Sequence, residues 1–226
     1  MVQLINICWT FWLYLKEVKA YYGNATLRRL DISLMLHYGR RNPFALSASA
    51  TRQGLDPDLT VYGETPWTTL QRILDAVAFT SEQHFVELGA GTGRNLCFVH
   101  CFYGSRVTGY ELIPDFVTLF SRWQQQPFVQ QLLPAEAVSL VHRNWFEVAL
   151  EGDVFLLVGT CYNARNRRQA ERVLRQLAPG KKVITISYRL PASDFLLLAS
   201  FAASFSWGKG TVFIQERVSA SPGATH

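Results

Sequence analysis

One segment organises the rest of this chain: Val86-Glu87-Leu88-Gly89-Ala90-Gly91-Thr92-Gly93. Its apolar start is typical of a buried strand, and its glycines predict a tight turn. Glycine reaches positive φ freely and lets a ligand approach the backbone closely. Residues 94–99 then predict the start of a helix, whose first N–H groups would point at that ligand. The segment indicates a ligand-binding turn, and the rest of the chain must identify the ligand.

The composition predicts one ordinary globular domain. With 226 residues, of which 49% are hydrophobic, the chain has enough apolar side chains for a full core. The net charge of +5 permits an acidic partner without requiring a nucleic acid. No CxxC pair is present among Cys8, Cys97, Cys101 and Cys161, so we expect no metal site. Cys97 and Cys101 are one helical turn apart, where we expect buried, reduced thiols. Reduced thiols in turn predict a reducing compartment, the cytoplasm.

The N-terminal residues 4–15, LINICWTFWLYL, are almost wholly apolar. They are shorter than the roughly 20 residues that span a bilayer, and no basic segment precedes them as in a signal peptide. Two interpretations remain open. The segment is either a helix packed on the domain or an interfacial helix, with its aromatic rings among lipid headgroups and Lys16 and Lys19 beside anionic lipid. The second interpretation predicts association with a membrane surface.

The region before the glycine turn predicts further helices. Asn24 is a suitable N-cap for a helix that ends at Gly39. Residues 40–59 show no clear period and predict a long loop. Thr65 is then a suitable N-cap, and Pro66 a suitable first residue, for a helix that continues to about residue 77.

Strands and helices alternate after the glycine turn. The predicted strands follow at 106–111, 137–141, 153–158, 182–188 and 211–218, and a helix leading into one more strand is predicted over 195–205. This alternation predicts an α/β fold with a doubly wound, mostly parallel, seven-stranded sheet. We expect an N-terminal helical extension over residues 1–55, the main domain over 56–218 and a tail over 219–226.

Several polar residues come at the ends of these strands. Glu111 ends the second strand 18 residues after Gly93, close to the spacing of about 20 expected for an acid that binds ribose. Asn144-Trp145 and residues 159–163 follow the third and fourth strands. Ligands of such sheets bind beyond the carboxyl ends of the strands, so these residues predict one common site.

The glycine motif distinguishes between two kinds of nucleotide site. It reads GxGxG after the acid Glu87, rather than the GxGxxG of dinucleotide sites, and no lysine follows it as in a P-loop. With the second-strand acid, it resembles motif I of the class I S-adenosylmethionine-dependent methyltransferases. Leu177-Ala178-Pro179-Gly180 before a strand is also similar to that family, and the resemblance covers about residues 60–218. It implies a Rossmann-like sheet and S-adenosylmethionine as cofactor.

A second motif, Val61-Tyr62-Gly63-Glu64-Thr65, resembles the non-SET histone-lysine methyltransferases, the disruptor-of-telomeric-silencing family. That resemblance implies a lysine amine of a protein as the methyl acceptor. It also implies contacts to the methionine, ribose and adenine parts of the cofactor. The residues that match are Glu64, Thr65, Glu87, Gly89, Gly91, Gly93, Glu111, Asn144 and Trp145.

Methyl transfer depends mainly on alignment of the donor and the acceptor. A lysine must lose its proton first, and an apolar, aromatic channel lowers its pKa from the ordinary value of about 10.4. Tyr62, Trp67, Tyr162 and Tyr188 are candidates for lining such a channel. Tyr162, Thr160 and Asn163 are candidates for orienting the amine, although Gly159-Thr160 stands where the resembled family has paired asparagines.

Other functions remain open at this stage. The acceptor is alternatively RNA or a small molecule, or the chain is a cofactor-binding module without catalysis. Residues 164–177 predict a helix with five arginines against one glutamate, which is either a solvated face or a patch for an acidic partner. No base-stacking motif accompanies these arginines, so nucleic acid lacks support as a partner.

Overall fold

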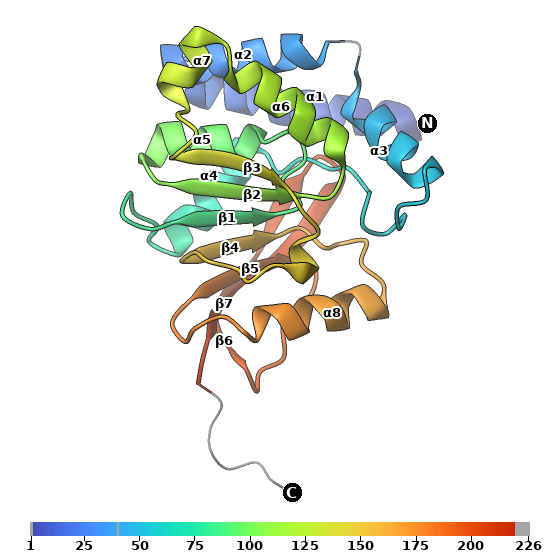
Figure 1. Ribbon diagram of the computed structural model, residues 1–226, viewed down its shortest axis with the longest axis vertical. Helices are drawn as coiled ribbons and strands as arrows, with labels where there is room; N and C mark the ends of the chain where they lie inside the picture. The colour runs from blue at the N-terminus through green and yellow to red at the C-terminus, as the bar shows by residue number, and fades with distance from the viewer. Residues whose placement is uncertain (1, 40, 220–226) are drawn as a thin grey trace, which may run out of the picture.

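The computed structural model describes residues 2–39 and 41–219 and contains one seven-stranded sheet in the order β3-β2-β1-β4-β5-β7-β6, seen in Figure 1. The strands are β1 (Phe85–Leu88), β2 (Val107–Glu111), β3 (Val138–His142), β4 (Val154–Leu157), β5 (Lys182–Ile186), β6 (Phe195–Phe205) and β7 (Gly208–Arg217). The first five strands are parallel, and β7 runs antiparallel to both β5 and β6. The predicted fold class is therefore confirmed.

Helices cover both faces of the sheet and create two apolar cores. One core packs helices against strand residues such as Phe85 and Val107, and the other packs the opposite face around Val86 and Leu88. The elements of the first core include α4 (Trp67–Ala76), α5 (Arg94–Tyr103), α6 (Pro114–Gln124) and α7 (Pro127–Leu132). Those of the second are the short helix η1 (Trp145–Glu147) and α8 (Ala164–Leu174). Alternate residues of β1 enter different cores because successive side chains of a strand point to opposite faces.

Three helices precede the sheet: α1 (Val2–Tyr21), α2 (Ala25–Tyr38) and α3 (Pro43–Arg52). The expected N-cap of α2 is confirmed, because Asn24 Oδ1 accepts hydrogen bonds from the backbone N–H groups of Thr26 and Leu27. None of the described helices is both long and apolar enough to cross a membrane.

The predicted loop over 40–59 is wrong in its central part, where α3 forms. Its N-cap is Asn42, whose side chain accepts a hydrogen bond from the Phe44 N–H, and Pro43 is its first residue. Ser47 and Ala50 are the only buried residues of α3. An apolar stripe is therefore missing, although the Asn-Pro capping signal is present.

Two further expectations need correction. Residues 195–205 form one continuous strand rather than a helix and a strand, because the whole stretch pairs with β7. An apolar run of this kind does not distinguish the two structures by period alone. The helix predicted from Thr65 begins at Trp67 instead, with Pro66 in the capping position. Residues 220–226 of the predicted tail lie outside the described residues.

Candidate functional site

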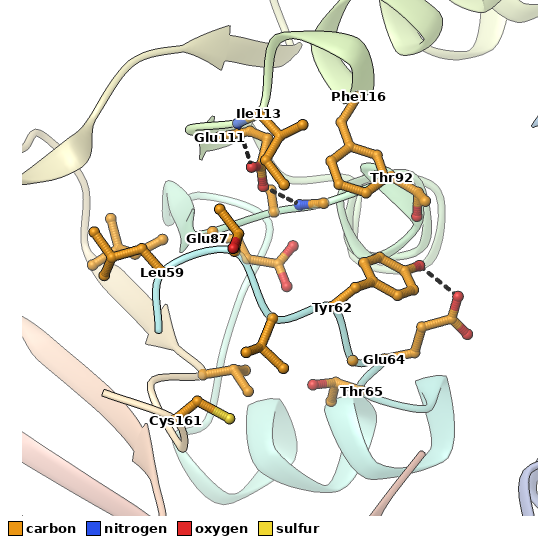
Figure 2. A pocket seen from close by; sticks show the side chains of 18 of the residues that line it. Leu59, Tyr62, Glu64, Thr65, Glu87, Thr92, Glu111, Ile113, Phe116 and Cys161 are labelled. Atoms are coloured by element: carbon orange, nitrogen blue, oxygen red, sulfur yellow. Dashed lines mark hydrogen bonds between the residues drawn. The ribbon is translucent and has the colours of Figure 1, made fainter. Parts of the chain in front are cut away.

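A cavity of about 330 Å³ opens at the carboxyl ends of β1, β2 and β4. This volume lies within the range of small-molecule sites. Four segments that are distant in sequence form most of its wall. They are residues 58–65, residues 87–95 without Gly93, Glu111 with Ile113 and Phe116, and residues 158–162 without Gly159. Figure 2 shows several of these side chains around the cavity. The common site expected at the strand ends is thus present as a cavity.

The three glycines of the turn differ in their surroundings. All three have positive φ, at 88° for Gly89, 52° for Gly91 and 73° for Gly93. No atom lies within 4 Å of where a Cβ on Gly89 would stand, so the backbone is open to a ligand there. A Cβ on Gly93 would lie 2.6 Å from the Phe120 ring, and Gly93 does not line the cavity. Gly93 therefore allows α5 to pack closely on α6.

Glu87 presents an unsatisfied carboxylate oxygen at the cavity. Its Oε1 accepts a hydrogen bond of 2.7 Å from Asn95 Nδ2, while Oε2 is buried without a partner. Burial raises the pKa of Glu87 to about 8, against the lowering effect of the Asn95 hydrogen bond. Figure 2 shows this carboxylate among the residues that surround the cavity. A buried carboxylate of this kind is suited to a cationic group of a ligand.

Glu111 lies across the cavity from the loop that carries Tyr62 (Figure 2). The Gly91 N–H donates to its Oε2 at 2.7 Å, and the Ile113 N–H donates to its Oε1 at 2.8 Å. Burial raises the pKa of Glu111, and these backbone hydrogen bonds act in the opposite direction. A carboxylate has about four acceptor positions, so each oxygen retains capacity for a ligand hydroxyl.

The turn between β6 and β7 holds the Tyr62–Thr65 loop in place. Glu64 exchanges two hydrogen bonds with Ser206: its N–H donates to Ser206 Oγ at 2.8 Å, and its carbonyl accepts from the Ser206 N–H at 3.1 Å. The Trp207 ring lies so close to Gly63 that an added Cβ would stand 2.5 Å from it. Sequence reasoning missed Ser206 and Trp207, because they are about 140 residues away in the chain.

Tyr62 covers the glycine turn from this loop. Its ring stacks on Phe116 with centroids 5.5 Å apart, and it contacts Phe44 edge-on at 5.1 Å. Its hydroxyl donates to Glu64 Oε1 at 2.6 Å, a bond drawn in Figure 2. Burial and the neighbouring Glu64 carboxylate raise the pKa of Tyr62 well above its ordinary value. Tyr62 is therefore a neutral hydrogen-bond donor in this site.

Of the predicted site residues after β4, some line the cavity and one caps a helix instead. Thr160, Cys161 and Tyr162 line the cavity, and burial raises the pKa of Tyr162 to about 12. Asn163 does not line it. Its side chain accepts from the Asn166 N–H as the N-cap of α8 and donates to Asp58 Oδ2 at 2.7 Å.

Asn144 and Trp145 also lie outside the cavity wall. Asn144 caps η1 by accepting from the Phe146 N–H, and its amide donates to Glu147 at 3.0 Å. Trp145 is buried with its ring 4.3 Å from that of Phe146. The expected contacts of these two residues with adenine stay a prediction.

Two expected channel residues belong to the cores instead. Trp67, the first residue of α4, is buried against Tyr21 of α1 and stacks on Phe98 of α5 at 5.0 Å. Tyr188 is buried in the second core. Neither lines the cavity. Over residues 2–39 and 41–219, no group of three or more His, Cys, Asp or Glu side chains is placed to hold a metal ion.

The sequence profile of the family described as histone methylation protein DOT1 matches residues 57–194, which is more than half of the chain. The chain belongs to the DOT1 family. This match includes all but one of the residues that line the cavity, Trp207 being the exception. A comparison with curated proteins found no match.

Solved structures agree with the fold. An RNA methyltransferase from Salinibacter ruber, in complex with S-adenosyl-L-homocysteine, is 20% identical with a TM-score of 0.56, covering 72% of this chain and 99% of its own. A variant of MtNAS in complex with S-adenosylmethionine is 16% identical with a TM-score of 0.53, and the match covers 78% of this chain and 73% of the MtNAS chain. TrmN from Thermus thermophilus is 14% identical with a TM-score of 0.53, and the match covers 72% of this chain and 52% of the TrmN chain.

The DOT1-family protein is thus a class I S-adenosylmethionine-dependent methyltransferase, with S-adenosylmethionine as its cofactor. The cavity has features that suit this molecule. Glu87 Oε2 is a buried acceptor without a partner, the backbone at Gly89 is open, and Glu111 retains acceptor capacity.

Proposed function

We propose that this protein transfers a methyl group from S-adenosylmethionine to a lysine amine of a protein substrate. The match over residues 57–194 to a family described by histone methylation carries this proposal, because the matched segment includes nearly the whole cavity. The solved structures share only the fold with this chain, so they do not favour one class of methyl acceptor over another.

The proposal assigns cofactor contacts to residues of the cavity. Glu87 Oε2 would accept the ammonium group of the cofactor, and Glu111 would accept its ribose hydroxyls. The open backbone at Gly89 and the turn at Gly91 would lie against it, with Glu64 and Thr65 on the opposite loop. The geometry of Glu87 supports this most directly, because a buried oxygen without a partner is unfavourable unless a ligand satisfies it.

The bound sulfonium would supply an electrophilic methyl group. The lone pair of the amine nitrogen would form the new N–C bond, and the electron pair of the broken S–C bond would stay on sulfur. Alignment contributes most to such a reaction, about 7–11 kcal/mol at best. Thr160 and Tyr162 line the cavity with hydroxyl groups that would orient the amine. A raised pKa of about 12 keeps Tyr162 protonated, so it would act by hydrogen bonding and not as a base.

The proton of the acceptor would be lost to water before transfer. The aromatic and apolar wall, which includes Tyr62, Ile113, Phe116 and Val158, disfavours a charged amine and so lowers its pKa. This wall supports an amine acceptor without a dedicated general base.

We also propose an acidic segment in the protein substrate. On α8, Arg165, Arg168 and Arg172 are exposed, and none forms an ion pair within the described part of the chain. In contrast, Arg175 pairs with Asp194 at 2.9 Å. Three unpaired guanidinium groups on one helix attract carboxylates.

Labelled S-adenosylmethionine and a cell extract test the acceptor class. Incubation with the purified protein is followed by separation into protein, RNA and small molecules, and by mass spectrometry of the labelled species. We expect label on a lysine side chain of a protein. Label on RNA or a small molecule would overturn the lysine proposal. Absence of label from a protein that binds the cofactor would instead indicate a module without catalysis.

A further inference from the structure

A second cavity, of about 630 Å³, lies beside the cofactor cavity. The N-terminal helix α1 contributes Thr10, Phe11, Leu13, Tyr14 and Glu17 to its wall. The rest comes from Phe44 of α3, from residues near Tyr62, from Arg94 of α5 and from the β6–β7 turn. Neither α1 nor α3 belongs to the segment that matches the DOT1 family, so part of the wall of this cavity lies outside the matched segment.

The two cavities share part of their walls. Tyr62, Glu64, Arg94 and Trp207 line both of them. Figure 2 shows that the Glu64 carboxylate lies on the far side of Tyr62 from Glu87, directed away from the cofactor cavity. Glu64 therefore offers its charge to the second cavity.

Aromatic rings and one unpaired carboxylate characterise this second cavity. The rings are those of Phe11, Tyr14, Phe44, Tyr62 and Trp207. Glu17 and Arg94 also line it, but they pair with each other at 3.1 Å. Glu64 accepts a hydrogen bond from the Tyr62 hydroxyl and has no ion-pair partner among residues 2–39 and 41–219.

This chemistry is complementary to an alkylammonium group. Aromatic faces attract a cation through their quadrupoles and pack against its methylene chain. A carboxylate supplies a charge-assisted hydrogen bond to the ammonium. The Glu64 carboxylate would repel an anion, and a purely apolar ligand would leave it without a direct ion-pair partner.

We propose that the second cavity receives a lysine-type side chain of the protein substrate in its protonated form. Its ammonium binds Glu64, and its methylene groups lie on the aromatic wall, which Phe11 and Phe44 complete. The helix α1 is then a substrate-recognition element next to the cofactor cavity. This inference rests on the proposed lysine specificity and adds a place where the substrate amine, still protonated, docks before it loses its proton and enters the cofactor cavity.

The direct test measures binding of n-butylammonium to the full-length protein saturated with S-adenosylhomocysteine, by saturation-transfer NMR titration. Glu64→Gln keeps the shape of the side chain and removes its charge, so we expect binding at least about tenfold weaker. Phe11→Ala removes one ring of α1 and should weaken binding by about threefold or more.

Matched controls separate these effects from general ones. Glu82→Gln alters an exposed carboxylate on the connection before β1, and Leu36→Ala alters an exposed apolar residue of α2. Both should bind the probe like the parent protein. Calorimetry with S-adenosylhomocysteine should give Phe11→Ala the affinity of the parent protein, which shows an intact fold and cofactor site.

Unchanged probe binding in both Glu64→Gln and Phe11→Ala would overturn the docking site. The extract experiment reports separately on the acceptor. A labelled lysine with no effect of Glu64→Gln on the probe would leave the proposed function standing and refute the docking site. Label on RNA would refute the function, and it would also overturn this assignment to a substrate lysine, whatever the probe binds.

Discussion

The Arg94 guanidinium donates from Nε to Asp31 Oδ1 across 2.6 Å, which joins the first residue after the glycine turn to helix α2. The same guanidinium bonds both oxygens of Glu17 on α1 and lies 4.2 Å from the centre of the Trp67 ring. Glu17 also accepts a hydrogen bond from the Trp67 N–H at the start of α4. The N-terminal helices thus fix the beginning of α5, where the cofactor turn ends.

Arg94→Met should destabilise the protein strongly. The substitution leaves Glu17 and Asp31 buried without a cation, and removal of one partner from a buried ion pair costs about 3–5 kcal/mol. Urea unfolding followed by circular dichroism measures this loss. Arg122→Met, at an exposed arginine of α6, is the control and should change stability by less than about 0.5 kcal/mol. A similar small effect of Arg94→Met would show that the ion-pair cluster contributes little.

Glu87 should make cofactor binding and stability depend on pH in opposite ways. Its folded pKa of about 8 is above the ordinary 4.5, so the free folded protein binds the proton more tightly than the unfolded chain. The stability of the free protein should therefore fall as pH rises from about 4.5 to 8. An ammonium ligand prefers ionised Glu87, so S-adenosylmethionine should bind more tightly toward pH 8 and release a proton on binding.

Calorimetry in buffers of different ionisation enthalpy measures that proton release. In Glu87→Gln the release attributable to this carboxyl should vanish, and affinity should fall by about tenfold or more because a charge-assisted hydrogen bond is lost. Glu82→Gln should keep both the affinity and the proton release. Equal proton release in Glu87→Gln and the parent protein would exclude Glu87 as the titrating group.

Gly63→Ala should disturb the site from outside the cofactor turn. A Cβ at this position meets the Trp207 ring at 2.5 Å, so the loop that carries Tyr62 and Glu64 must move away from the β6–β7 turn. We expect weaker S-adenosylmethionine binding, by about tenfold, measured by calorimetry. The double substitution Gly63→Ala with Trp207→Ala removes the clash and should recover part of that loss relative to Trp207→Ala alone. Additive effects of the two substitutions would contradict this explanation.

The interfacial interpretation of α1 predicts binding to anionic vesicles. Trp12 and Leu15 are exposed, while Leu13 and Glu17 are buried against the domain, and the Lys16 ammonium lies 3.5 Å from the Trp12 ring centre. Flotation with phosphatidylserine vesicles should decrease by at least about threefold in a Trp12→Ser, Leu15→Ser variant. Leu36→Ser on α2 is the matched control and should float like the parent protein. Equal flotation of all three proteins would remove the membrane interpretation.

The local part of the site was predictable from the sequence. Glycines at 89 and 91 and the acid Glu111 are fixed by a strand end and a short spacing, so their neighbours in the chain are sufficient to place them. The order of strands and helices followed for the same reason, since apolar period and turn residues are local signals. The exceptions, α3 and β6, are elements whose burial does not follow a simple helical stripe.

Contacts between distant segments were decided only by the tertiary structure. Thr65 has the chemistry of an N-cap, yet the start of α4 is capped by Glu17, which lies 50 residues away in the chain. Ser206 and Trp207 support the Tyr62 loop, and Asn163 is drawn away from the cavity by Asp58. The sequence alone determined the nucleotide-binding turn, its acids and most of the succession of strands and helices along the chain, because these depend on residues close together in the chain. Which side chains retain free hydrogen-bonding capacity in the cavity depends on partners that only folding brings near.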